Sequence, residues 1–194
     1  MDKTTDWIQT FSGKKFYPLE PDMEDIHIVD IAKALSHICR FNGHCNRFYS
    51  VAEHSLSCLG LARHMGYSYA DRYACLMHDA AEAYLSDVVR PVKRFLQGYA
   101  FYEYQLEEMI FKKYGITYPF GEKLHKVDNI MLATERRDLF HEPDDWHMLK
   151  EEPTDFFDVS KPMQHGAINI MQAFLAEFMN LRKALRLPVE NEDL

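Results

Sequence analysis

Apolar side chains recur every three to four positions along most of the chain, and this spacing predicts amphipathic helices. The first run covers about residues 23–38, where Ile28, Ile31 and Leu35 fall on one face. Similar runs predict helices over about residues 50–66, 68–85, 100–114, 121–140 and 167–187. No segment shows the sustained alternation of apolar and polar residues that marks a strand. We therefore expect an all-α fold.

Short polar signals define where several of these helices begin and end. Ser50 and Glu53 form a Ser-x-x-Glu pattern, which predicts a capping box at a helix start. Gly115 is placed to end a helix, and Pro91 suits a first helical turn. The remaining segments are expected to be loops, over about residues 7–23, 40–49, 86–90 and 141–165, the last of which could cover one side of a site.

Length and composition fit one globular domain over residues 1–194, with its core at about 23–140 and a C-terminal helix at about 167–187. Apolar residues make up 47% of the chain, yet no run approaches the roughly 18 residues of a membrane span. The N-terminus has no apolar signal core, and the four cysteines show no Cys-x-x-Cys spacing. These features predict a reduced, cytoplasmic protein that does not enter membranes. A net charge of −8 argues against broad nucleic-acid binding.

One group of residues has the side chains expected of a metal site. His78 and Asp79 stand side by side in an alanine-rich helical pattern, with His54 upstream and Asp128 downstream. Imidazoles and carboxylates are the ligands expected for zinc, manganese or cobalt. Glu82 follows Asp79 by three positions and so lies on the same side of a helix. Its carboxylate could move a proton at water on the metal.

These residues stand in ordered motifs that extend well beyond the His-Asp pair. The stretches are 39–43 (CRFNG), 49–55 (YSVAEHS), 78–87 (HDAAEAYLSD) and 90–93 (RPVK), and they follow 7–10 (WIQT) and 13–16 (GKKF). The set resembles the HD-domain metal-dependent phosphohydrolases, in particular the bacterial 5′-deoxynucleotidases and, more closely, the phage dATP triphosphohydrolases. The resemblance covers about residues 7–139 and implies a single helical HD-domain bundle.

The resemblance also implies roles for individual residues. The implied metal ligands are His54, His78, Asp79 and Asp128. The implied catalytic residues are Asp79 and Glu82, with Glu82 orienting or deprotonating the attacking water. The implied substrate-binding residues are Arg40, Phe41, Gly43, Asp87, Pro91 and Lys93. The expected cofactor is a divalent ion, zinc, cobalt or manganese, with additional magnesium as an option.

Within the substrate residues, Arg40 and Lys93 would grip phosphate and Asp87 would accept a hydrogen bond from the 3′-hydroxyl. Phe41 stands where relatives often carry tryptophan, so it can stack on a base or sugar but lacks the indole N–H. Gly43 supplies no side chain and would leave its wall of the pocket open. The phenylalanine at position 41 is a departure from the relatives, and it weakens any inference about which base or sugar is bound.

The function expected from this resemblance is hydrolysis of dATP to deoxyadenosine and triphosphate, which would deplete a deoxynucleotide pool. The alternatives are a 5′-deoxynucleotidase acting on monophosphates, a hydrolase of signalling nucleotides, and a non-catalytic nucleotide-binding module. The ligand set alone does not separate the two deoxynucleotide reactions, because in each the metal would act beside the α-phosphate. The expected partners are a small deoxynucleotide and further copies of the chain, as a dimer or hexamer, in the cytoplasm or a phage host's cytoplasm.

Overall fold

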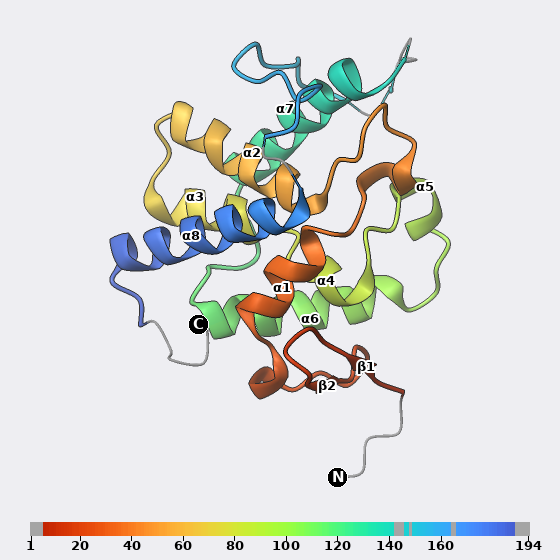
Figure 1. Cartoon of the computed structure of the whole chain (residues 1–194), viewed down its shortest axis with the longest axis vertical. Helices are drawn as coiled ribbons and strands as arrows, with labels where there is room; N and C mark the ends of the chain where they lie inside the picture. Colours follow the sequence, from red (N-terminus) through yellow and green to blue (C-terminus); the bar gives the residue numbers. More distant parts are fainter. Residues whose placement is uncertain (1–5, 142–145, 148, 164–165, 189–194) are drawn as a thin grey trace.

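The computed structural model describes residues 6–141, 146–147, 149–163 and 166–188, and these form a helical bundle with one very small sheet (Figure 1). The all-α prediction is confirmed. The sheet pairs β1 (Ile8–Gln9) with β2 (Lys15–Phe16) in antiparallel register. It lies inside the segment expected to be irregular. Within the described residues, no helix has both the length and the apolar character needed to cross a membrane.

The helices of the described residues run in the following order. They are η1 (Met23–Asp25), α1 (Ile28–Leu35), η2 (Arg40–Gly43), α2 (Val51–His64), α3 (Tyr69–Met77), α4 (Glu82–Leu85), α5 (Arg90–Lys93), α6 (Tyr99–Tyr114), α7 (Glu122–Leu139) and α8 (Ala167–Leu185). The expected loop over residues 141–165 contains no helix or strand where it is described, and its residues 142–145, 148 and 164–165 lie outside the described part.

Helix α2 lies at the centre of the bundle, because it packs against α3, α7 and α8, while α1 packs against α8 and α4 (Figure 1). One apolar cluster joins α1, α3, α6 and α8 and includes the fully buried Phe111, Phe174 and Phe178. A second cluster lies between α2, α3 and α7 and includes Val127 and Met131. Burial of this apolar surface is the main force that holds the helices together. It places polar residues of α2, α3 and α7 next to one another.

The signals for helix ends act as the sequence predicted. The backbone N–H of Glu53 donates to Oγ of Ser50 at 3.2 Å, and the Glu53 carboxylate accepts from the Ser50 N–H at 3.2 Å. Gly115 follows α6 with φ of 70°, a conformation that costs glycine little. Pro91 stands in the first turn of α5.

Two expected helices are shorter than predicted. The helix expected over residues 68–85 ends at Met77, and hydrogen bonds between residues three apart then lead into α4, for example from the Glu82 N–H to the Asp79 carbonyl. In such a tight turn, residues three apart eclipse one another, so Glu82 stays on the side of Asp79. The helix expected over residues 23–38 is divided into η1 and α1.

Candidate metal centre

His54 stands in the first turn of α2 with a side chain that is completely buried. Its Nδ1 atom lies 2.5 Å from Oε1 of Glu135, which is also fully buried and belongs to α7. An ionised carboxylate can only accept a hydrogen bond, so Nδ1 donates to Glu135 and Nε2 is the ring nitrogen that remains to hold either a proton or a metal ion. Glu135 therefore holds one side of the imidazole, and Nε2 on the other side of the ring faces His78 and Asp128.

His78 is fixed in the same way by a different acceptor. It caps the C-terminal end of α3, and its Nδ1 donates to the carbonyl of Cys75 at 2.9 Å. Its Nε2 then lies 3.3 Å from Nε2 of His54. Two imidazole lone pairs facing one another at this distance repel, unless a cation or a proton lies between them. The donor set thus fits a metal ion, because both histidines present their free nitrogen to one point.

Two carboxylates complete the surroundings of these nitrogens. Oδ1 of Asp128, on α7, lies 3.2 Å from Nε2 of His54 and 4.0 Å from Nε2 of His78. Oδ1 of Asp79 lies 3.2 Å from Nε2 of His78, and Oδ2 lies 3.7 Å from Nε2 of His54. The structure therefore brings together all four residues that the sequence suggested as ligands.

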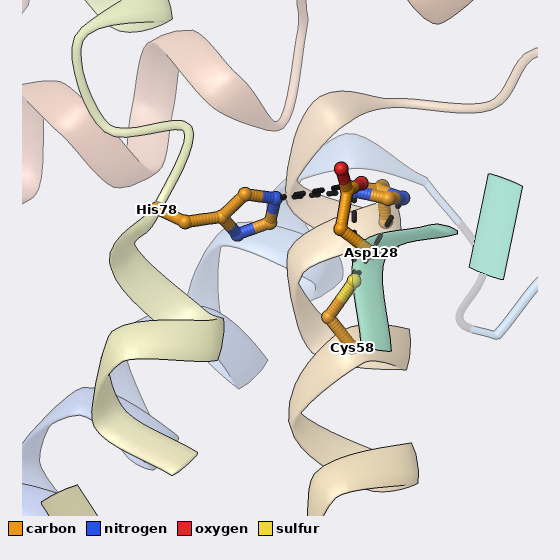
Figure 2. Close-up of side chains that lie close together, drawn as sticks. Cys58, His78 and Asp128 are labelled. Carbon is orange, nitrogen blue, oxygen red and sulfur yellow. Dashed lines mark hydrogen bonds and ion pairs between the residues drawn. The ribbon is translucent and has the colours of Figure 1, made fainter. Parts of the chain in front are cut away.

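Cys58 adds a sulfur to this cluster, which the sequence analysis did not anticipate. Ligand atoms of His54, Cys58, His78 and Asp128 all lie within 4.8 Å of one another. Figure 2 shows His78 extending from one side toward Asp128, with Cys58 reaching up from α2 beneath it. This buried group of two imidazoles, one thiol and one carboxylate could hold a metal ion.

The close approach of these side chains shifts the pKa values of Asp128 and His54. Burial opposes a charge on Asp128, but the hydrogen bond from His54 and the two imidazoles hold the pKa of its carboxyl below the usual range. Burial and Arg40 oppose a positive charge on His54, yet its pKa is raised because Cys58, Glu135 and Asp128 favour the protonated form. A proton and a metal ion therefore compete for the same lone pair, and acid should weaken metal binding.

Glu82 lies beside the cluster at the start of α4. Burial raises the pKa of its carboxyl, and the negative charges of Asp79 and Asp87 raise it further. Its Oε2 atom is buried and has no hydrogen-bond partner among the described residues. A buried oxygen without a partner costs free energy, so this atom is suited to bind water or a ligand that enters the site.

Glu135 connects the metal-ligand cluster to the arginine that was expected to bind phosphate. Its Oε2 atom lies 3.2 Å from Nη2 of Arg40, and its Oε1 accepts from the hydroxyl of Tyr49 at 2.9 Å. Nη1 of Arg40 lies 3.5 Å from Oδ2 of Asp79. Burial would lower the pKa of Arg40, but Glu135 and Asp79 hold it well above its usual value. The guanidinium is thus charged and placed between two carboxylates.

Phe41 and Gly43 follow Arg40 in η2, and their backbones are unusual. Phe41 has φ of 54° and Gly43 has φ of 78°, both in the left-handed region. The Arg40 guanidinium lies 5.1 Å from the centre of the Phe41 ring, and Phe140 and Trp146 pack against the same ring. A side chain at position 43 would meet little except the Cys39 sulfur. The wall at Gly43 is open as expected, but the positive φ is a sufficient reason for glycine there.

The remaining expected substrate residues lie around α5. Burial raises the pKa of Asp87, while the charge of Arg40 acts in the opposite direction. Lys93 points toward α6, with its Nζ atom 2.5 Å from Oε1 of Glu103. Arg90, next to Pro91, places Nη2 3.5 Å from Oδ2 of Asp128 and so connects α5 to the metal-ligand cluster.

Sequence reasoning missed Cys58 and Glu135, although helical spacing held a signal for both. Cys58 follows His54 by four residues on α2, one helical turn away. Glu135 follows Asp128 by seven residues on α7, two turns away. Each therefore shares a face with an expected ligand.

Comparison with known proteins places relatives in two bacteria. The chain is 40% identical over 179 residues to the uncharacterised protein YfdR of Escherichia coli K12, across 91% of this chain and 98% of YfdR. It is 35% identical over 115 residues to an uncharacterised protein of Rhodobacter capsulatus, across 57% of this chain and 59% of that protein. No protein-family model matches the chain.

Proposed function

This chain belongs to the same protein family as Escherichia coli YfdR, and we propose that it is a metal-dependent phosphohydrolase of deoxynucleotides. Its helical fold and its His/Cys/His/Asp cluster are compatible with an HD-type domain. The proposed preferred reaction is hydrolysis of dATP to deoxyadenosine and triphosphate. This choice rests on the extended set of motifs between residues 7 and 93, including 7–10 and 13–16, which resembles the dATP triphosphohydrolases.

One observation carries the proposal. Both histidines use Nδ1 to donate to a protein acceptor, and both present Nε2 to one point, 3.3 Å apart, with Asp128 Oδ1 3.2 Å from one of them. Two imidazole nitrogens and a carboxylate oxygen that converge on one point are the arrangement that a metal ion requires. When bound, a divalent ion would acidify water and stabilise charge on phosphoryl oxygens.

Glu82 is the proposed acid–base residue of the reaction. Its raised pKa means that it can hold a proton at a pH at which an ordinary glutamate is ionised. Its unpartnered Oε2 gives it an atom with which to orient a water molecule toward the α-phosphorus. Attack by that water breaks the bond between phosphorus and the 5′-oxygen, and the 5′-oxygen takes up a proton as deoxyadenosine leaves.

Arg40 and Lys93 are the proposed phosphate-binding residues, and in this structure both form ion pairs with carboxylates. Arg40 contacts Glu135 and Asp79, and Lys93 contacts Glu103. A phosphate oxygen would compete with these carboxylates for the same N–H donors. The high density of acidic groups favours a triphosphate that arrives with its own magnesium ion, because a bare polyanion would be repelled.

Asp87 and Phe41 are the proposed contacts to the nucleoside. Asp87 would accept a hydrogen bond from the 3′-hydroxyl and hold the sugar so close that a 2′-hydroxyl clashes with Phe41. Because Arg40 lies over the ring of Phe41, the aromatic surface left for stacking on a base is limited. The open wall at Gly43 leaves space for a purine 2-amino group, so dGTP should be a poorer but measurable substrate.

The test is to incubate the metal-loaded protein with dATP, dGTP, ATP and dAMP and to separate the products by chromatography. The proposal predicts that dATP gives deoxyadenosine and triphosphate, with ATP turned over much more slowly. Release of orthophosphate from dAMP alone, with dATP intact, would assign the protein to the 5′-deoxynucleotidases. Equal turnover of ATP and dATP would contradict the proposed contacts to the sugar.

A further inference from the structure

Cys58 lies inside the metal-ligand cluster, although nothing in the proposed reaction requires a thiol there. The residue is almost completely buried, at 1% exposure. Its sulfur lies 3.5 Å from Nε2 of His54, the nitrogen that faces the cluster, and 4.0 Å from Nδ1 of the same ring. The sulfur is therefore a buried nucleophilic group that lies beside the His54 ring, at the edge of the cluster.

The spacing of the ligand atoms fits joint coordination of one ion. Zinc-type bonds of about 2.0–2.3 Å in a tetrahedral arrangement place nitrogen and sulfur ligands about 3.3–3.6 Å apart. The Nε2 atom of His54 lies 3.5 Å from the Cys58 sulfur, 3.3 Å from Nε2 of His78 and 3.2 Å from Oδ1 of Asp128. Three separate neighbours of His54 thus lie near the separation that such a centre requires, whereas Nε2 of His78 and Oδ1 of Asp128 are 4.0 Å apart and would have to approach each other when an ion binds.

We propose that Cys58 is a ligand of the metal ion, bound as a thiolate together with His54, His78 and Asp128. When the sulfur–metal bond forms, the S–H bond breaks and its proton passes to solvent, and no electron is transferred. The metal of the proposed phosphohydrolase would therefore be held by sulfur as well as by the nitrogen and oxygen ligands that the sequence suggested, and it would take the attacking water as a fifth ligand.

Charge balance supports this ligand set. Two neutral imidazoles, one thiolate and one carboxylate carry two negative charges, which a divalent ion neutralises. The Asp79 and Glu135 carboxylates add two further negative charges at the edge of the cluster, and Arg40 lies 3.5 Å from the first and 3.2 Å from the second. Arg40 compensates one of these two charges, so the surroundings of a divalent ion stay negative.

The proposal has a consequence for the choice of metal. Thiolates favour zinc and cobalt, whereas manganese and magnesium prefer oxygen ligands. A centre with Cys58 as ligand should therefore select zinc or cobalt over manganese. Without the sulfur, the remaining imidazoles and carboxylates would discriminate less among these ions.

The test loads the metal-free full-length protein with cobalt(II) and records its absorption spectrum. Visible d–d bands report that cobalt is bound, and an intense near-ultraviolet thiolate-to-cobalt charge-transfer band reports a sulfur ligand. We expect both in the wild type and in Cys75→Ala, which removes an equally buried thiol outside the group of four. We expect Cys58→Ala to keep d–d bands and to lose the charge-transfer band.

Bound cobalt in the wild type without a charge-transfer band would overturn the proposal, and this readout holds even if Cys58→Ala does not fold. Persistence of the band in a folded Cys58→Ala protein would do the same. In parallel, chelator competition should show that Cys58→Ser loses zinc affinity by at least about tenfold, as the loss of a supporting group alone can do, with a smaller loss for manganese. The spectrum does not depend on turnover. The charge-transfer band can therefore be absent from a protein that hydrolyses dATP, and it can be present in a protein that does not.

Discussion

The Nδ1 atom of His54, on α2, lies 2.5 Å from Oε1 of Glu135, on α7, and neither side chain is exposed to solvent. The same carboxylate reaches Arg40 through its other oxygen at 3.2 Å. One buried group therefore orients an imidazole of the metal-ligand cluster and also holds the guanidinium proposed to bind phosphate. Metal affinity and phosphate binding should both depend on Glu135.

Replacement of Glu135 should weaken the centre without removing a ligand. Glu135→Gln keeps an acceptor for His54 but removes the charge that holds the imidazole and Arg40. Loss of such a supporting partner typically lowers metal affinity about 10–100-fold. Competition with a chromophoric chelator measures this effect. Tyr49→Phe removes the third hydrogen bond to Glu135 and leaves the contact with His54, so it should change the affinity much less. Equal affinity in Glu135→Gln and wild type would show that His54 needs no orienting partner.

Removal of an imidazole from the cluster should abolish stoichiometric metal binding. His78→Ala deletes one of the two facing nitrogens, and elemental analysis of the purified protein should find little metal. His64→Ala provides the control, because His64 is exposed at the end of α2 and stacks on Phe156. Full metal content and full turnover in His78→Ala would contradict the site.

Glu82 should contribute to the rate and not to substrate binding. Glu82→Gln retains the shape of the side chain but cannot take up or release a proton. A positioned acid–base group typically contributes ~10²–10⁴-fold to turnover, so kcat should fall within this range while KM stays close to the wild-type value. Glu122→Gln, at an exposed position on α7, serves as the control in the same steady-state assay. An unchanged kcat would leave Glu82 with no part in the chemistry.

A carboxyl outside the cluster should make stability depend on pH. Burial raises the pKa of Glu107 from 4.5 to about 7, although the Tyr118 hydroxyl donates to it at 2.7 Å. The folded state therefore binds the proton more tightly than the unfolded state. The stabilisation is fully present below about 4.5 and is lost as the pH rises through about 7. The loss should be about 1–2 kcal/mol, after allowance for solvent screening of a partly exposed group.

Urea denaturation at pH 5 and pH 8 measures this dependence. Glu107→Gln should lose less stability than the wild type between these two pH values. The neighbouring Glu108→Gln should behave as the wild type, because Glu108 is exposed. Identical pH dependence in the wild type and Glu107→Gln would show that the carboxyl ionises freely in the folded protein.

The residues whose role depends on local spacing could be predicted from the sequence. Apolar periodicity predicted the main helices, and the Ser50–Glu53 pattern predicted the start of α2 at the right residue. Because the cap fixes the start of α2, the position of His54 in its first turn could also be predicted. Asp128 could be assigned to a helix, but only the packing of α7 against α2 shows that it meets His54.

Features that depend on packing could not be predicted. The alanine-rich run after Met77 has high helical propensity, so nothing local marks the tight turn between α3 and α4. A lone buried cysteine such as Cys58 usually packs as a small apolar residue, and its proximity to a metal ligand depends on the burial of α2. Glu135 resembles an ordinary polar residue of an exposed helix face until Arg40 is placed against it.

The central claim is that water attacks the α-phosphorus of a deoxynucleotide at the centre formed by His54, His78 and Asp128. The most direct measurement incubates the metal-loaded protein with dATP in water enriched in oxygen-18 and analyses both products by mass spectrometry. We predict unlabelled deoxyadenosine together with triphosphate that carries one oxygen-18 atom, and no reaction in His78→Ala. Oxygen-18 in the deoxyadenosine, or intact dATP and dAMP in the presence of protein with stoichiometric metal, would contradict this account.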